Sequence, residues 1–164
     1  QGEVSQTRRI VRRVNAAEIY KNLSKDLDAV IITHLSNPSD DYKPYSVSAR
    51  SIDCLTKLKY SDKSYNGVGF EGLVITDDLS MLALLDYVEH KKLDQTAQKL
   101  VAGCKTLEGK AAVLAINAGA HAVIALSADT TDIVKGISYA ARINPEFMLK
   151  LENALSKYQK FAGK

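Results

Sequence analysis

The fold class follows from the stretch Gly69-Phe-Glu-Gly-Leu-Val-Ile-Thr-Asp-Asp-Leu-Ser-Met81. It has a glycine-rich turn, a short apolar run, and two aspartates where that run ends. A nearly continuous apolar run is typical of a strand that is buried on both faces of a parallel sheet. Parallel barrels present carboxylates in this way, at the mouth where their strands end. We therefore expect a strand from Gly72 to Thr76, with an acid pair at its carboxyl end.

Two further apolar runs predict strands, one from Asp28 to His34 and one from His121 to Ser127. Apolar spacing and capping residues predict helices over 8–26, 49–59, 107–117, 130–141 and from Pro145 to Phe161. Strands that alternate with helices indicate an α/β fold with parallel βα units and right-handed crossovers.

The segments between these elements are less regular. The polar composition of 35–47 predicts a loop, and 60–69 is expected to be a polar turn. Asp77 or Asp78 is expected to begin the helix that follows the acid pair. The charged stretch 89–106 is interpreted as either a helix or a long connection.

The size of the chain limits how much of a barrel it can form. It has 164 residues, 46% of them hydrophobic and 25% charged, which is an ordinary globular composition. That length suits one domain. A complete eight-stranded α/β barrel typically needs about 250 residues, so we expect 1–164 to be a single domain that is too short for a complete barrel.

The formal charge is mildly basic, at +3. Arg8, Arg9, Arg12 and Arg13 form a local cluster, which fits either a phosphate or nucleic-acid patch or a solvated helix face. Neither an aromatic platform nor a nucleic-acid motif accompanies the cluster, which favours the solvated face. We expect no nucleic-acid partner.

Cysteine usage and hydropathy give weak information on compartment. Cys54 and Cys104 do not form a CxxC motif, and buried free thiols are expected rather than a disulfide. No apolar stretch approaches the roughly 18 residues that span a membrane, so no membrane partner is expected. No signal peptide is visible, but Gln1 is not a natural start residue. The compartment stays unknown, with a bacterial cytoplasm or periplasm favoured.

Asp77 is the first candidate for chemistry because it directly follows the strand Leu73-Val-Ile-Thr76. Ligands of α/β proteins bind at the carboxyl ends of the strands. A carboxylate on a rigid strand end can act as a nucleophile toward an anomeric carbon. Asp77 and Asp78 can equally cap the next helix, and both interpretations stay open. Our hypothesis assigns chemistry to Asp77 and capping or orientation to Asp78.

Other strand ends carry weaker candidates. Thr33 and His34 end the first strand, where a histidine can contact a ligand or orient a carboxylate. Ser127 and Asp129 follow the third strand and fit either contacts to sugar hydroxyls or helix capping. No acid stands at metal-ligand spacing from the remaining histidines, so we expect no metal. The glycines before the second strand do not form a dinucleotide fingerprint. Packing and sugar stacking stay open for the tyrosines of the 35–69 region, Tyr42, Tyr45, Tyr60 and Tyr65.

The string GFEGLVITDDLSM closely resembles the nucleophile segment of glycoside hydrolase family 3, and is nearest to the branch that removes β-linked N-acetylglucosamine. The β-glucosidase branch usually has Trp directly after the nucleophile, where this chain has Asp78. Further segments from residue 28 onward are similar to the last strands and closing helices of that family's barrel: Asp28–His34, Asn37–Ser46, Ala115–Ala120, Val123–Ser127 and 136–162.

The resemblance implies a retaining glycosidase whose nucleophile is Asp77, and a chain that corresponds to the last three strands of a (β/α)8 barrel. The implied substrate is a terminal β-N-acetylglucosamine, often from peptidoglycan fragments, and no cofactor is implied. The candidate substrate contacts are His34, Thr33, Asp78 and Ser127.

This chain departs from the family pattern in four ways. The histidine loop that supplies the acid/base upstream of these strands is missing, and His34 occupies a different position. The sugar-binding Asp and Arg of the family's earlier strands are missing too. The residue after Met81 is usually Gly, but here it is Leu82, and the stretch from there to Lys110 is longer than usual. We therefore expect the complete protein to be a glycosidase and the 164-residue chain alone to be inactive.

Two rival hypotheses remain beside the glycosidase, and the first of them follows from the open sheet. A three-strand piece of a barrel leaves strand edges and an apolar face uncovered, which favours association. The chain can thus be a non-catalytic remnant that binds a sugar or a protein, its partner being the missing N-terminal half or a second copy. An unrelated flavodoxin-like binding domain with a capping Asp pair is the third hypothesis.

Overall fold

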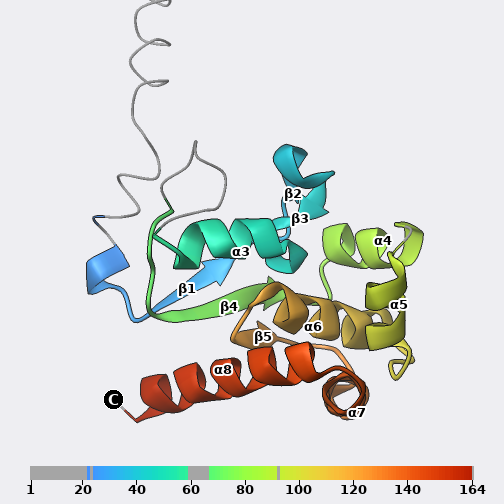
Figure 1. The fold of residues 1–164 in the computed structure, drawn as a ribbon. Coiled ribbons are helices and arrows are strands. Elements are labelled where there is room, and N and C mark those ends of the chain that lie inside the picture. Colours follow the sequence, from blue (N-terminus) through green and yellow to red (C-terminus); the bar gives the residue numbers. More distant parts are fainter. Residues whose placement is uncertain (1–21, 23, 59–66, 92, 164) are drawn as a thin grey trace, which may run out of the picture. The chain divides into compact units, whose positions relative to one another are not determined.

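The structure is a computed structural model that describes residue 22 and residues 24–58, 67–91 and 93–163 (Figure 1). The chain divides into two compact units. The first comprises Gln1–Leu27 with Asp53–Glu71, and the second comprises Asp28–Ile52 with Gly72–Lys164. Most of the predicted helix 8–26, most of the predicted turn 60–69, and Tyr60 and Tyr65 lie outside the described residues.

In the first unit, the described residues form a 3-10 helix, Ser24–Asp26, and the second half of helix α3 (Ala49–Thr56). The same unit includes residues 67–71, which lead to the central strand. The backbone N–H groups of Val68 and Phe70 donate to the carbonyl oxygens of Cys54 and Leu55, both over 2.9 Å. A Cβ on Gly67 would lie 1.8 Å from the Lys57 carbonyl oxygen. Only glycine fits there, so this glycine allows the segment to approach the end of α3.

The second unit contains a parallel sheet of three strands in the order β1 (Ala29–Ile32), β4 (Leu73–Asp78) and β5 (Ala122–Ile124) (Figure 1). Ala29 is aligned with Leu73 on one side of β4, and Ile75 with Ala122 on the other. The predicted parallel direction of the three strands is confirmed. The described residues form an open sheet and no closed barrel.

A small antiparallel hairpin, β2 (Ser36–Asn37) and β3 (Lys43–Pro44), follows β1 and holds the 3-10 helix Pro38–Asp40. A further 3-10 turn, Tyr45–Val47, leads to α3. Sequence reasoning predicted only a loop over 35–47, because strands this short show no alternation of polar and apolar residues. Ser48 caps α3 as predicted, since its hydroxyl oxygen accepts from the Ser51 N–H over 3.0 Å.

Five helices complete the second unit: α4 (Leu82–His90), α5 (Gln95–Val101), α6 (Leu107–Ala118), α7 (Thr130–Ile143) and α8 (Pro145–Ala162). The predicted helices over 107–117, 130–141 and 145–161 are confirmed within two residues. Gly119 ends α6 in the left-handed conformation, at φ 109°, as the sequence predicted. The stretch 89–106 holds the end of α4 and all of α5.

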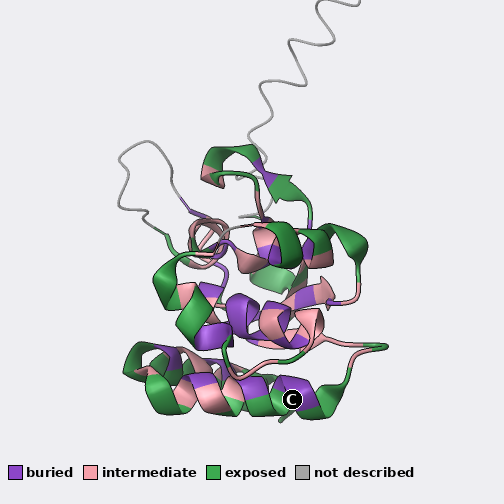
Figure 2. Cartoon of the chain, turned by 90° about the vertical axis from the view of Figure 1, so that its right-hand side faces the viewer, coloured by how far each residue is buried: buried purple, intermediate pink, exposed green. Residues whose placement is uncertain are grey.

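Helix α6 forms the centre of the core. It contacts α4, α5, α7 and α8 (Figure 1), and all but a few of its residues are buried. Small side chains at Ala111, Ala112 and Ala115 allow these neighbours to approach closely. Helix α8 is an amphipathic surface helix, since Phe147 and Ala154 are buried while most of the residues around them are exposed. Figure 2 shows buried and exposed residues side by side along the outer helices.

A buried carboxylate joins the start of α6 to α7. Asp132 accepts hydrogen bonds from the Lys105 N–H over 3.1 Å, from the Thr106 N–H over 2.9 Å and from the Thr106 hydroxyl over 2.7 Å. Burial raises the pKa of Asp132, but the hydrogen bonds from Thr106 and Lys105 outweigh it and hold the pKa below its ordinary value. We call Lys105, Thr106 and Asp132 the helix-junction cluster.

Two remaining expectations concern cysteines and membranes. Neither Cys54 nor Cys104 is in a disulfide, as predicted, but both are half-buried rather than buried. Of the helices that the structure describes, none combines the length and the apolar character that crossing a membrane requires.

Candidate functional site

The candidate site lies where β4 ends. The strand continues through Asp77 and Asp78, two residues beyond the predicted end, and α4 begins only at Leu82. Met81 precedes α4 and offers no side-chain cap. The prediction that Asp77 or Asp78 begins this helix is therefore wrong. The physical reason is that Asp78 pairs with Ile124 of β5, which keeps the acid pair in the strand.

Asp77 is half-exposed at the carboxyl end of the central strand. Its Oδ1 accepts a hydrogen bond from the Asp78 N–H over 2.9 Å. Within the described part of the chain, the second carboxylate oxygen has no hydrogen-bond or ion-pair partner. Strand geometry thus fixes the side chain while one oxygen stays available to a ligand.

Asp78 makes a different set of contacts. Its carboxylate accepts from the Ser80 hydroxyl, from the Ser80 N–H over 3.3 Å and from the Leu126 N–H over 3.2 Å. The Ser80 hydroxyl, followed by the Leu126 N–H, holds the pKa of Asp78 below its ordinary value. These bonds fasten the turn after β4 to the chain that leaves β5, which is an orienting role.

His34 links the end of β1 to the same point. Its imidazole is 2% exposed, with Nε2 3.0 Å from the Asp78 carbonyl oxygen and Nδ1 2.7 Å from the Ser46 hydroxyl oxygen. A carbonyl oxygen only accepts, so Nε2 carries a proton and donates it. In the neutral ring, Nδ1 then accepts from Ser46. This fixed orientation holds the backbone of Asp78 against β1.

We call His34, Ser46, Asp77, Asp78 and Ser80 the strand-end cluster. It joins all three strands: His34 follows β1, the aspartates end β4, and the residue after β5 donates to Asp78 through its backbone. Sequence reasoning missed Ser46 and Ser80. Ser80 could have been found from its spacing, because it lies two residues after Asp78, as in a local side-chain turn.

The other predicted site residues lie around this cluster. The Thr33 hydroxyl oxygen accepts from the Leu35 N–H over 3.3 Å, a local turn contact. Ser127 is exposed, and no described residue hydrogen-bonds to its side chain. Asp129 caps α7 by accepting from the Thr131 N–H over 2.9 Å, so the capping interpretation is confirmed. The proposed sugar contacts of Thr33, His34 and Ser127 stay predictions.

Exposed apolar side chains surround the strand ends. Leu35 follows β1, Met81 and Leu82 follow β4, and Leu126 follows β5; the exposed fractions of Leu82 and Leu126 are both 82%. The acid pair therefore lies among surfaces that favour contact with the apolar face of a ligand or with another chain.

His121 belongs to the opposite end of the sheet. It is buried, and its Nδ1 accepts from the Val74 N–H over 3.0 Å. Burial, assisted by the charge of Lys157, lowers the pKa of His121 to about 4. This histidine is a neutral acceptor that completes the backbone hydrogen bonding of β4.

Among the residues that the structure describes, no three or more His, Cys, Asp or Glu side chains come close enough to hold a metal ion. Comparison with protein-family models gives no match, and comparison with curated proteins gives none either.

Proposed function

We propose that this chain carries the nucleophile of a retaining glycoside hydrolase, which cleaves terminal β-N-acetylglucosamine from glycans or peptidoglycan fragments. The motif around Asp77 supports the proposal by its resemblance to glycoside hydrolase family 3. The observation that carries it is the position of Asp77: a half-exposed carboxylate at the end of the central strand, with one oxygen held by the backbone and one oxygen available.

The chemistry assigned to Asp77 has two steps. In the first, its free oxygen attacks the anomeric carbon, the bond from that carbon to the aglycone oxygen breaks, and the aglycone leaves with a proton from a general acid. In the second, water attacks the anomeric carbon, gives a proton to the same group acting as base, and releases the sugar and the Asp77 carboxylate. The acid/base histidine is assigned to the missing part of the barrel.

Asp78 and His34 are assigned positioning roles in this scheme. Their hydrogen bonds hold the three strand ends together, which keeps the Asp77 carboxylate in one orientation. A prepositioned nucleophile lowers the entropic part of the barrier.

A substrate that needs no general acid can test the nucleophile in this chain alone. 5-Fluoro-β-N-acetylglucosaminyl fluoride is suitable, because fluoride leaves without protonation and the ring fluorine slows hydrolysis of the covalent intermediate. We expect intact-mass spectrometry to show one added fluorosugar on the wild type and none on Asp77→Asn. Asp129→Asn, which retains a capping side chain, is the matched control and should label like the wild type. A sugar on a residue other than Asp77, or labelling of Asp77→Asn like the wild type, would overturn the proposal.

A second candidate function is association, and the open sheet favours it. Within the described chain, β1 and β5 each pair on one side only, and Ile31 of β1 is 62% exposed. We propose that the partner is the missing N-terminal half of the barrel or a second copy of this chain. Light scattering on the purified protein tests the second copy: a dimer that Ile31→Lys dissociates would support it, and a monomer would leave the missing half as the partner.

A further inference from the structure

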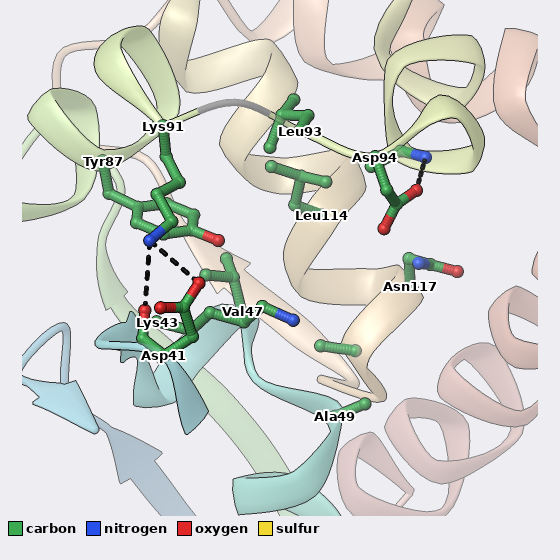
Figure 3. Close-up of a pocket in the computed structure, with 12 residues that line it drawn as sticks. Asp41, Lys43, Val47, Ala49, Tyr87, Lys91, Leu93, Asp94, Leu114 and Asn117 are labelled. Carbon is green, nitrogen blue, oxygen red and sulfur yellow. Dashed lines mark hydrogen bonds and ion pairs between the residues drawn. The ribbon is translucent and has the colours of Figure 1, made fainter. Parts of the chain in front are cut away.

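A cavity of about 320 Å³ is lined by none of the strand-end cluster residues. Figure 3 shows the residues that line it. Its walls come from the hairpin and the 3-10 turn that follows it, the end of α4, the start of α5 and the end of α6. The volume is at the lower end of the range of small-molecule sites, about 300–1,000 Å³. The space therefore suits a small metabolite rather than a nucleotide.

One side of the cavity is apolar. Val47, Leu93 and Leu114 line it, with Ala97 and Ala118 alongside. Leu114 and Ala118 are buried residues of α6, so a rigid helix supports this surface. A ligand that fills the space must present an aliphatic part of a few carbon atoms here.

The first pair of charges in the cavity is already neutralised. The Lys91 ammonium lies 2.9 Å from the Asp41 carboxylate and 3.3 Å from the carbonyl oxygen of the same residue. The pKa of Asp41 is held below its ordinary value, mainly by this hydrogen bond and the charge of Lys91. This pair closes one side of the cavity and has little net charge to offer a ligand.

The second pair of charges is not joined. Lys43 makes no ion pair with any residue that the structure describes. Asp94 uses Oδ1 to accept from the Ala97 N–H over 2.9 Å, while its other oxygen has no partner in the described chain. In Figure 3, the Lys43 ammonium and the Asp94 carboxylate lie on different sides of the open space. The cavity thus has one available cation and one available anion.

Two neutral polar groups complete the lining. Tyr87 is half-buried, and burial together with the charges of Asp40, Asp41 and Asp94 raises the pKa of its phenol above the ordinary value. The phenol stays neutral at physiological pH and can both donate and accept. Asn117 directs its carbonyl side toward Lys150, 3.4 Å away, which leaves the amide hydrogens for a ligand.

We propose that this cavity binds a small zwitterion of the α-amino acid class, with its carboxylate on Lys43, its ammonium on Asp94 and its aliphatic side chain against Val47, Leu93 and Leu114. A simple anion such as phosphate fits poorly because Asp94 repels it. A simple cation fits poorly because Lys43 repels it. Only a ligand with one charge of each sign satisfies both available groups.

Calorimetric titration of the full chain with L-leucine, L-leucinamide and N-acetyl-L-leucine tests the proposal. Leucinamide lacks the carboxylate, and N-acetyl-leucine lacks the ammonium. We expect saturable, one-to-one binding of leucine, and affinities for the two analogues that are weaker by about tenfold or more, since each loses a charge-assisted hydrogen bond. Equal affinity for all three ligands, or no saturable binding of leucine, would overturn the proposal.

Variants identify the site. Lys43→Met keeps the aliphatic stem and should weaken leucine binding while removing the preference for leucine over leucinamide. Asp94→Asn keeps the cap of α5 and should remove the preference for leucine over N-acetyl-leucine. Lys135→Met and Asp86→Asn change exposed charges that do not line the cavity and should bind leucine like the wild type. Unchanged leucine binding in both cavity variants would contradict the assignment.

Discussion

The strand-end cluster and the helix-junction cluster both rest on an aspartate that accepts several hydrogen bonds. In the helix-junction cluster, Asp132 is buried, and its carboxylate joins α7 to the start of α6. In the strand-end cluster, Asp78 has the same structural role between β4 and the end of β5. Asp77 differs from both, because it is half-exposed and one of its oxygens has no partner in the described chain. The comparison separates carboxylates that hold the fold from the carboxylate that is available for chemistry.

Removing the carboxylate of the helix-junction cluster should have the largest effect on stability. Asp132→Ala leaves the Lys105 and Thr106 N–H groups without their acceptor, and we expect a loss of about 2–4 kcal/mol in the free energy of unfolding. Urea unfolding followed by circular dichroism measures it. Asp129→Asn on the same helix is the control and should change stability little. If Asp132→Ala lost less stability than Asp129→Asn, the structural role of Asp132 would be contradicted.

Packing beside this cluster gives a second test. A Cβ on Gly136 of α7 would lie 2.3 Å from the Cys104 sulfur atom. Gly136→Ala should therefore destabilise the protein by about 1–3 kcal/mol through overpacking. In a Cys104→Ala background the same substitution should be neutral or stabilising by up to about 1 kcal/mol, because alanine favours the helix. A double-mutant cycle without coupling would refute this contact.

The amino end of the sheet should respond to pH in a defined range. The pKa of His121 is about 4 in the folded protein, against an ordinary value of 6.5. Below pH 6.5 the unfolded chain therefore binds a proton on His121 that the folded chain does not. The stability that His121 contributes is thus fully present above pH 6.5 and is lost as the pH falls toward 4. We expect a loss on the order of 1–3 kcal/mol in the free energy of unfolding over this range.

A matched variant isolates this contribution. His121→Asn retains an acceptor for the Val74 N–H but does not titrate, so its stability should change less between pH 6.5 and 4 than that of the wild type. Urea unfolding at several pH values measures the slope. Identical slopes in the two proteins would show that another group is responsible.

The strand-end cluster should give the smallest effect on stability. Ser80→Ala removes the hydrogen bond that lowers the pKa of Asp78 most, so we expect that pKa to rise toward its ordinary value, with only a small loss in stability. Carbon-detected NMR titration of the aspartate carboxyl groups measures both Asp78 and Asp77 in one experiment. A shift confined to Asp77 would reverse the roles assigned to the pair.

The elements with strong local signals were predictable. The apolar runs identified β1, β4 and β5, while Gly119 and Pro145 marked the end of α6 and the start of α8. The extension of β4 through Asp78 was not predictable, because aspartates rarely favour strands and the extension depends on pairing with β5. The hairpin after β1 was missed for a related reason, since strands of two residues carry no periodicity.

The candidate site was predictable only in part. The position of Asp77 and Asp78 at a strand end follows from the local sequence. The partners Ser46 and Ser80 depend on how the chain folds back, and Ser46 lies twelve positions from the histidine that it contacts. The cavity lay beyond sequence reasoning altogether, since Lys43, Asp94 and its other lining residues come from separate segments without a shared pattern.

The central claim is that Asp77, and not its neighbour, is available for chemistry. Fragment-mass mapping of the wild-type chain after reaction with 5-fluoro-β-N-acetylglucosaminyl fluoride tests it most directly, because the two aspartates are resolved by a single backbone cleavage. We expect the sugar on Asp77, with Asp78 unmodified. A sugar on Asp78, or on a carboxylate outside the strand-end cluster, would contradict it.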